Sequence, residues 1–254
     1  MSPQHELLSL RGVSKHFGRV IVATDLDLSV ADGEALGIVG PNGAGKSTLF
    51  SMISGDLRPD AGTVWFDGND VTGAHAYQRT RAGIGRTYQI PRPFENLTVF
   101  ESVLVCCHQG GGRRGRDAAD RAADILERTG LRAEANTAAG RLGLLQRKRL
   151  EMARALGTDP KLLLLDEVAG GLTDPEVAEL VEVVQGIRAD GLAVVWIEHV
   201  VHALVKTVDR MLCLAGGRIV ADGSPLEVLA NAEVRELYLG GGPESATADE
   251  ETES

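Results

Sequence analysis

GPNGAGKST, at residues 40–48, fits the pattern G-x-x-x-x-G-K-[ST] at Gly40, Gly45, Lys46 and Ser47. The apolar segment EALGIVG precedes it, and KSTLFSMISG follows with helical character as far as Gly55. Glycines allow backbone N–H groups to turn inward without steric cost, and these groups, with the positive end of a helix, hold phosphate oxygens. The sequence therefore predicts a strand, a phosphate-binding loop and a helix, in that order.

The loop residues have distinct expected roles. Lys46 is expected to reach the β- and γ-phosphates of a nucleotide, and the Ser47 hydroxyl to hold Mg²⁺. The alternative is a glycine-rich turn that binds nothing, which the flanking strand and helix disfavour. The predicted nucleotide-binding residues are Gly40, Pro41, Asn42, Gly43, Ala44, Gly45, Lys46, Ser47 and Thr48.

A second chemical segment lies about 120 residues downstream, where LLLLDE occupies residues 162–167. A continuous apolar run is typical of a parallel strand buried on both faces. In phosphate-loop enzymes an aspartate at such a strand end supports Mg²⁺, which predicts that role for Asp166. Glu167 is then placed to orient or deprotonate a water molecule. Two acids that merely begin a solvated loop are the alternative, disfavoured by the phosphate loop upstream.

The remaining pattern indicates strands that alternate with helices, as in a largely parallel α/β sheet. Strands are expected at Leu7–Val13, at Gly62–Gly68 and in LAVVWIE, with a hairpin around Gly216–Gly217. The stretch from about residue 92 to 158 is expected to be mainly helical, within a single unit spanning residues 1–240. Residues 241–254 are polar and acidic and are expected to be disordered.

Composition narrows the class of protein. The chain has 254 residues, 43% of them hydrophobic, and a formal net charge of −10, which argues against nucleic-acid binding. The three cysteines lack the spacing of a disulfide framework, which favours a reducing, cytoplasmic setting. No signal peptide is expected, and no apolar run approaches the ~20 residues that span a bilayer. A role at a membrane would therefore depend on a partner.

On these motifs and their order, the sequence resembles the ATP-binding cassette (ABC) ATPases from about residue 6 to 239. Phe17 stands where that family stacks an aromatic ring on adenine, and Gln89 matches the Q-loop glutamine, which senses Mg²⁺ and the membrane partner. Glu167 matches the general base. Asp174 matches the D-loop, and His199 matches the switch histidine that contacts the γ-phosphate.

The resemblance implies an α/β fold of the P-loop NTPase (RecA-like) type, with an antiparallel β subdomain and an inserted α-helical subdomain. It implies ATP and Mg²⁺ as cofactors, with Ser47, Gln89 and Asp166 at the metal. It also implies a second cassette, as homo- or heterodimer, two transmembrane permease subunits and, indirectly, a solute-binding protein. The protein would lie at the cytoplasmic face of the membrane. The segments GIGRTYQIPRPFENLTVFESVLV and RLEMARALGTDPKLLLLDE resemble branched-chain amino acid importers; urea and amide importers are similar.

The family's LSGGQ signature is altered here. It stands as LGLLQ at residues 142–146, so Leu142, Gly143 and Gln146, with Asp174, are the residues expected to face a partner's nucleotide. Without the serine, the signature lacks a hydroxyl that would donate a hydrogen bond to a phosphate, and a hydrogen bond to a charged group is worth ~1.5–3 kcal/mol. The leucines at 144 and 145 are also expected to crowd the phosphates. A nucleotide-binding structural subunit with weak turnover is therefore the alternative function.

Two smaller groups of residues have simple explanations. His199 and His202, with Glu198 beside them, suggest a metal site, because residues three apart share a helix face. The sequence offers no third ligand for this histidine pair at a sensible spacing. The three basic residues of 147–149 are expected to form a solvated helix face.

Overall fold

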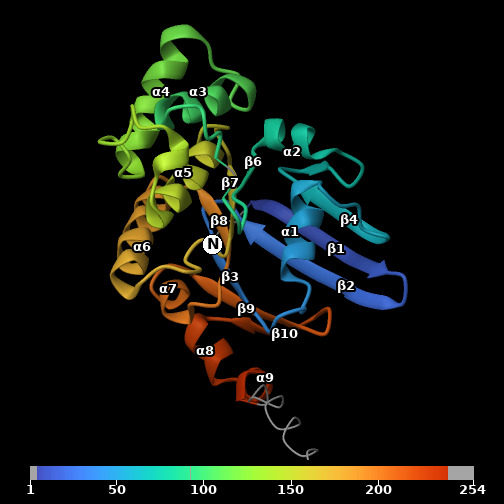
Figure 1. Cartoon of the computed structure of the whole chain (residues 1–254). Coiled ribbons are helices and arrows are strands. Elements are labelled where there is room, and N and C mark those ends of the chain that lie inside the picture. The colour runs from blue at the N-terminus through green and yellow to red at the C-terminus, as the bar shows by residue number, and fades with distance from the viewer. Residues whose placement is uncertain (1–4, 92, 240–254) are drawn as a thin grey trace, which may run out of the picture.

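The computed structural model describes residues 5–91 and 93–239. A six-stranded sheet forms its centre, in the order β10-β9-β3-β8-β7-β6 (Figure 1). The pairs β3–β8, β3–β9, β7–β8 and β6–β7 are parallel, and only β9–β10 is antiparallel, as a hairpin. Its strands are β3 (Ala35–Val39), β6 (Ile84–Arg86), β7 (Leu162–Asp166), β8 (Ala193–Ile197), β9 (Arg210–Ala215) and β10 (Arg218–Gly223).

The strands β3, β8 and β7 are buried on both faces of the sheet, which explains their continuous apolar sequences. In β7, Leu162 and Leu164 pack into one core, whereas Leu163 and Leu165 pack into a second core on the opposite face. Successive side chains of a strand point to opposite faces, so a strand between two cores has apolar side chains on both faces, here up to its last residue, Asp166. The predicted buried strand at 162–166 is confirmed to the residue.

A second, antiparallel sheet has the order β2-β1-β4-β5. Helix α1, which follows the phosphate loop, packs between the two sheets, because Leu49, Phe50 and Ile53 share one core with strands of both. The strand β2, VIVATDLDLSVA, was not predicted, although its burial alternates in the manner of a half-buried strand. These elements are β1 (Glu6–Phe17), β2 (Val20–Ala31), β4 (Ala61–Phe66), β5 (Asn69–Asp70) and α1 (Lys46–Ser54).

Helices cover the other face of the central sheet. Three of them lie between β6 and β7 in the chain and form the upper left part of Figure 1. The helices on this face are α3 (Val99–Gln109), α4 (Gly115–Arg128), α5 (Leu144–Leu156), α6 (Asp174–Ala189), α7 (Val201–Val205), α8 (Pro225–Ala230) and α9 (Ala232–Leu239), with a 3₁₀ turn η1 (Ala139–Arg141). Helix α2 (Ala76–Ala82) instead lies beside α1 and β6 (Figure 1). The tail predicted at 241–254 lies outside the described residues.

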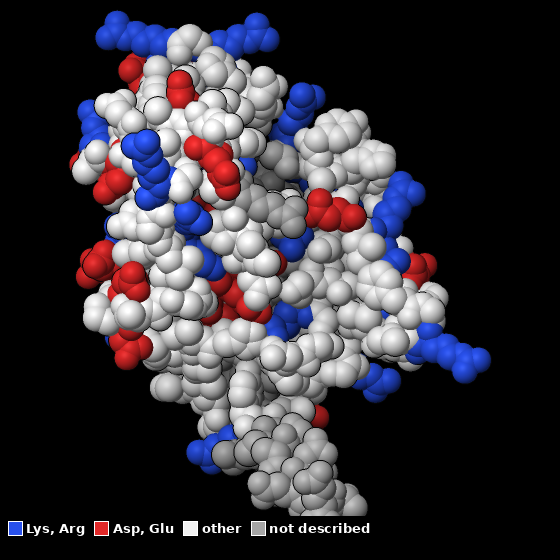
Figure 2. All heavy atoms as spheres, viewed as in Figure 1, with Lys and Arg blue, Asp and Glu red and all other residues white. Residues whose placement is uncertain are grey.

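The surface carries both signs of charge. On the face in Figure 2, Asp and Glu side chains lie over the helical side, and Lys and Arg side chains lie among them and at the edges. Within residues 5–91 and 93–239, no helix combines the length and the apolar character that crossing a bilayer requires.

Candidate functional site

The phosphate loop joins the end of β3 to the start of α1, as predicted. Gly40, Gly43 and Gly45 all have positive φ, at 150°, 79° and 100°. A Cβ on Gly40 would lie 2.0 Å from the Leu214 carbonyl oxygen, and one on Gly45 would lie 2.4 Å from that of Val22. Glycine is therefore required at both positions by backbone conformation and by space.

Lys46 holds its ammonium group inside this loop. Its Nζ donates hydrogen bonds to the carbonyl oxygens of Gly40 at 2.7 Å and Pro41 at 3.0 Å, and the residue is 5% exposed. Burial lowers the pKa of Lys46, and the nearby Glu167 carboxylate opposes that change. A cation thus stands at the point where inward-turned amides and a helix N-terminus meet, an arrangement suited to phosphate.

Asp166 ends β7 and is 3% exposed. Its Oδ2 accepts a hydrogen bond from Arg86 Nη2 at 3.0 Å, whereas Oδ1 is buried and has no hydrogen-bond partner among the described residues. Burial raises the pKa of Asp166, and the hydrogen bond from Arg86 opposes this. A buried carboxylate oxygen without a partner is costly, so Oδ1 fits a cation such as Mg²⁺.

Glu167 lies at the centre of a cluster built from three strand ends. Its Oε2 accepts a hydrogen bond from Gln89 Nε2 at 2.5 Å, and its Oε1 lies 2.8 Å from His199 Nε2. The three residues follow β6, β7 and β8, which are neighbours in the sheet. Parallel strands end at the same edge, which explains how residues 78 and 32 positions apart meet. Glu167 also has a positive φ of 48°, a conformation that turns the chain sharply after β7.

Other predicted site residues lie apart from this cluster. Phe17 ends β1 with its ring half exposed, and Lys15 Nζ lies 5.6 Å from the ring centroid. Asp174 is the first residue of α6, whose N-terminus is formed by a capping box of Thr173 and Glu176. Among residues 5–91 and 93–239, neither Phe17 nor Asp174 forms a hydrogen bond or ion pair with the phosphate loop.

The altered signature forms the turn into α5. Gly143 is the N-cap residue, Leu142 is buried and Gln146 is partly buried. The two leucines differ: Leu145 is 5% exposed and packs in the main core, whereas Leu144 is 44% exposed. The expectation that both leucines crowd a phosphate is therefore wrong for Leu145, because its side chain faces the interior.

The predicted solvated face at 147–149 is also wrong. Lys148 is 4% exposed, and its Nζ donates hydrogen bonds to the backbone oxygens of Gln89 at 2.9 Å and Glu167 at 3.1 Å. Arg147 donates to the oxygens of Leu142 and Gly140. Lys148 is directed inward by carbonyl groups of two distant segments, which local sequence does not report.

Glu198 is a further residue whose role the sequence did not indicate. It is 1% exposed, and its carboxylate accepts hydrogen bonds from the backbone N–H groups of Ala169 at 2.6 Å and His199 at 3.2 Å. Burial raises its pKa, and the backbone hydrogen bonds oppose this. The Glu198 carboxylate therefore holds the loop after β7 against the loop after β8.

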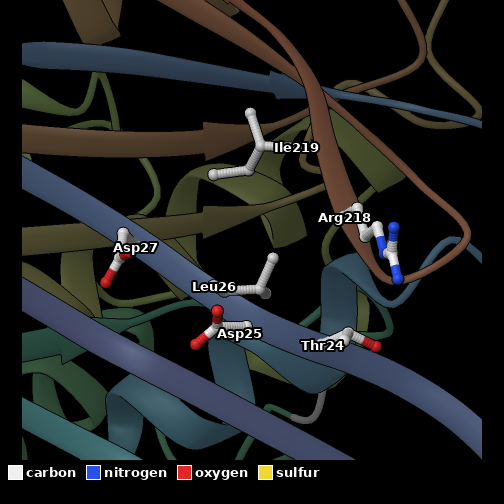
Figure 3. A pocket seen from close by; sticks show the side chains of 6 residues that line it. All are labelled: Thr24, Asp25, Leu26, Asp27, Arg218 and Ile219. Atoms are coloured by element: carbon white, nitrogen blue, oxygen red, sulfur yellow. The ribbon is translucent and has the colours of Figure 1, made fainter.

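A separate hollow of about 450 Å³ lies between β2 and the start of β10 (Figure 3). Two hydrogen bonds join its lining to β1: the Asp27 carboxylate accepts one from Gly12 N at 2.8 Å, and the backbone N–H of Asp25 donates one to Ser14 Oγ. These contacts stabilise the irregular pairing of β1 with β2. The chemistry therefore lies at the strand ends and not in this hollow.

Comparisons with known proteins agree with this geometry. A family model described as "ABC transporter" matches residues 23–170, and one described as "Branched-chain amino acid ATP-binding cassette transporter" matches residues 218–244. The chain is 34% identical over 249 residues to the high-affinity branched-chain amino acid transport ATP-binding protein LivG of Escherichia coli (strain K12), covering 92% of this chain and 98% of that protein. It is 30% identical over 233 residues to the lipopolysaccharide export system ATP-binding protein LptB of the same organism, covering 92% and 97%.

Among solved structures, the ADP conformation of MJ1267, an ATP-binding cassette of an ABC transporter, superposes with a TM-score of 0.84. The two chains are 30% identical, and the match covers 93% of this chain and 99% of that one.

Proposed function

This chain belongs to the ABC transporter family, and we propose that it hydrolyses ATP to power uptake of branched-chain amino acids or a related small polar solute. One observation carries this proposal. The Glu167 carboxylate is held between Gln89 and His199, beside the phosphate-loop lysine, in the arrangement required to direct water at a terminal phosphate.

Each residue of the site has a proposed role. Lys46 and the loop amides bind the phosphates, and the exposed ring of Phe17 stacks on adenine. Glu167 polarises the attacking water, and His199 holds both Glu167 and the γ-phosphate. These groups bring water and phosphorus together in line, and orientation of this kind supplies much of the rate in phosphoryl transfer.

Mg²⁺ is the proposed metal cofactor. Asp166, Ser47 and Gln89 would hold it, consistent with the buried Oδ1 of Asp166, which has no hydrogen-bond partner in the part of the chain that the structure describes. When bound, Mg²⁺ offsets negative charge on the phosphate oxygens.

The assembly is proposed to contain a second cassette, two permease subunits and, indirectly, a solute-binding protein, at the cytoplasmic face of the membrane. In a pair of cassettes, Leu142, Gly143, Gln146 and Asp174 of this chain would face the partner's nucleotide. The region around Gln89 would transmit closure and opening of the pair to the permeases. Support comes from family membership and from the exposed position of Gln89 at a strand end.

The choice of solute rests on the relatives. The match of residues 218–244 and the 34% identity to LivG favour branched-chain amino acids over lipopolysaccharide export, at 30% identity to LptB. Urea or amide uptake is the alternative within importers. Uptake of labelled leucine and of labelled urea by cells that lack this chain, with and without the restored gene, distinguishes the two.

A structural subunit with weak turnover is the second candidate, and the altered signature favours it, with Gly143 in place of serine and the exposed Leu144 in place of glycine. The assembled Glu167, Gln89 and His199 cluster favours the ATPase. ATP turnover of the assembled transporter with Glu167→Gln in this chain separates the two. A fall toward the background rate supports the ATPase, and an unchanged rate supports the structural subunit.

ATP affinity provides the complementary test. Lys46→Ala is expected to weaken ATP binding by roughly 10- to 100-fold, since a hydrogen bond to a charged group has that worth. Lys206→Ala is the matched control, because Lys206 is exposed at the end of α7. Equal ATP affinity in both variants contradicts the proposed binding site.

A further inference from the structure

We propose that Lys148 is a positioning residue that ties the signature helix α5 to the segments bearing Gln89 and Glu167. The inference rests on the proposed function, in that these two residues act in ATP hydrolysis. It adds a physical connection within one chain: the helix that begins at the partner-facing signature also sets the position of this chain's own catalytic glutamate.

The contacts define the connection. Lys148 Nζ donates to the backbone oxygens of Gln89 at 2.9 Å and of Glu167 at 3.1 Å, so one ammonium group joins the segment after β6 to the segment after β7. The same two residues join a second time through their side chains, 2.5 Å apart. Two links between the same pair of residues restrict their relative position far more than either link alone.

Helix α5 is well placed to transmit movement. It lies beside β6 and β7 (Figure 1), and Lys148 follows the N-cap Gly143 by little more than one turn. Arg147 anchors the turn before the helix through the oxygens of Leu142 and Gly140. A shift of α5 along the sheet edge therefore changes the hydrogen bonds of Lys148 before it changes any contact of the phosphate loop.

The neighbouring basic residue has a different direction and offers a contrast. Arg149 Nη2 donates to Glu179 Oε2 at 2.7 Å, on α6, and within residues 5–91 and 93–239 it forms no hydrogen bond with either catalytic segment. Burial lowers the pKa of Lys148, and the charges of nearby carboxylates, Glu198 and Glu167 first among them, oppose this. Burial of an ammonium group is costly unless it is hydrogen-bonded, so the carbonyl oxygens of Gln89 and Glu167 hold Lys148 in this position.

Glu198 extends the connection to the third catalytic segment. Its carboxylate accepts hydrogen bonds from the Ala169 amide, just past Glu167, and from the His199 amide. One buried cation and one buried anion thus fix the three loops that carry Gln89, Glu167 and His199. Removal of Lys148 is expected to loosen the first two loops while the phosphate loop retains its own contacts.

The test compares Lys148→Met with Lys148→Arg and with Arg149→Met as the matched control on the same helix. The readouts are kcat and KM for ATP in the assembled transporter, and hydrogen exchange of residues 84–91 and 162–170 in the full chain. For Lys148→Met, kcat is expected to fall roughly 10- to 100-fold with KM changed by less than about threefold, since two charge-assisted hydrogen bonds are lost. Exchange is expected to rise in both peptides, whereas Lys148→Arg restores part of kcat because a guanidinium group donates to two carbonyls.

Two results would overturn the proposal: unchanged exchange in both peptides, or equal losses of kcat in Lys148→Met and Arg149→Met. If Lys148→Met does not fold, Lys148→Gln takes its place in the same comparison. An assembled transporter with the wild-type chain that binds ATP without turnover contradicts the proposed function instead, and the exchange comparison still decides the role of Lys148.

Discussion

Gly45 and Gly43 allow one stereochemical argument to be tested within a single loop. Both have positive φ, at 100° and 79°. A Cβ on Gly45 would lie 2.4 Å from the Val22 carbonyl oxygen, whereas a Cβ on Gly43 would meet nothing within 4 Å. Gly45→Ala therefore adds a collision with the backbone of β2 to a conformational strain that the two variants share.

The expected magnitudes follow from these distances. In both variants the left-handed backbone of the alanine lowers the free energy of unfolding by about 1–2 kcal/mol. The lower conformational entropy of the unfolded chain raises it by about 0.4–1 kcal/mol. The ordinary Cβ contact begins near 3.4 Å, so Gly45→Ala requires the loop or β2 to move by about 1 Å. Overpacking of this kind costs about 1–3 kcal/mol more.

The measurement is thermal unfolding of the two variants and the wild type without nucleotide. Gly45→Ala is expected to melt roughly 2–12 °C below Gly43→Ala, because 1 kcal/mol shifts the melting temperature of a chain of this size by about 2–4 °C. Urea unfolding gives the same difference as a free energy. Equal stability of the two variants would refute the reasoning, because it would mean that Val22 gives way freely.

Three further predictions follow from other contacts. Tyr238→Phe removes the hydroxyl that accepts a hydrogen bond from the Gly40 amide of the phosphate loop at 2.9 Å. It is expected to weaken ATP affinity roughly 2- to 10-fold in a binding titration, and unchanged affinity would show that α9 does not position the loop. Leu145→Ala, at a buried position, is expected to lower the free energy of unfolding by about 2–5 kcal/mol, and Leu144→Ala, at an exposed position, is expected to lower it by much less. Similar losses for the two variants in urea unfolding would contradict the orientation of these side chains. The hydrogen bond from the Ser224 side chain lowers the pKa of Glu227 below its ordinary 4.5, so the stability that ionised Glu227 contributes is complete above about pH 4.5 and is lost as the pH falls through the pKa of the folded state. Glu227→Gln is therefore expected to reduce the dependence of the urea unfolding midpoint on acid pH, and an unchanged dependence would contradict this linkage.

The sequence alone predicted the elements whose reasons are local. A strand buried on both faces has an apolar side chain at every position, so residues 162–166 were identifiable, with Asp166 and Glu167 at their end. The glycines of the phosphate loop were identifiable because positive φ restricts the residue type at those positions. The strand β2 was missed although its residues alternate, because its polar positions resemble a loop.

Contacts between distant segments depended on the fold. Lys148, Glu198 and Tyr238 meet backbone groups 19 to 198 residues away, at Glu167, Ala169 and Gly40. A charged residue in a helix has the same local pattern whether water or a carbonyl group receives its hydrogen bond. The periodicity of a sequence indicates which face of a helix or strand is buried. It does not indicate which group that face contacts, because the contact forms only when strands from different parts of the chain end at one edge of the sheet.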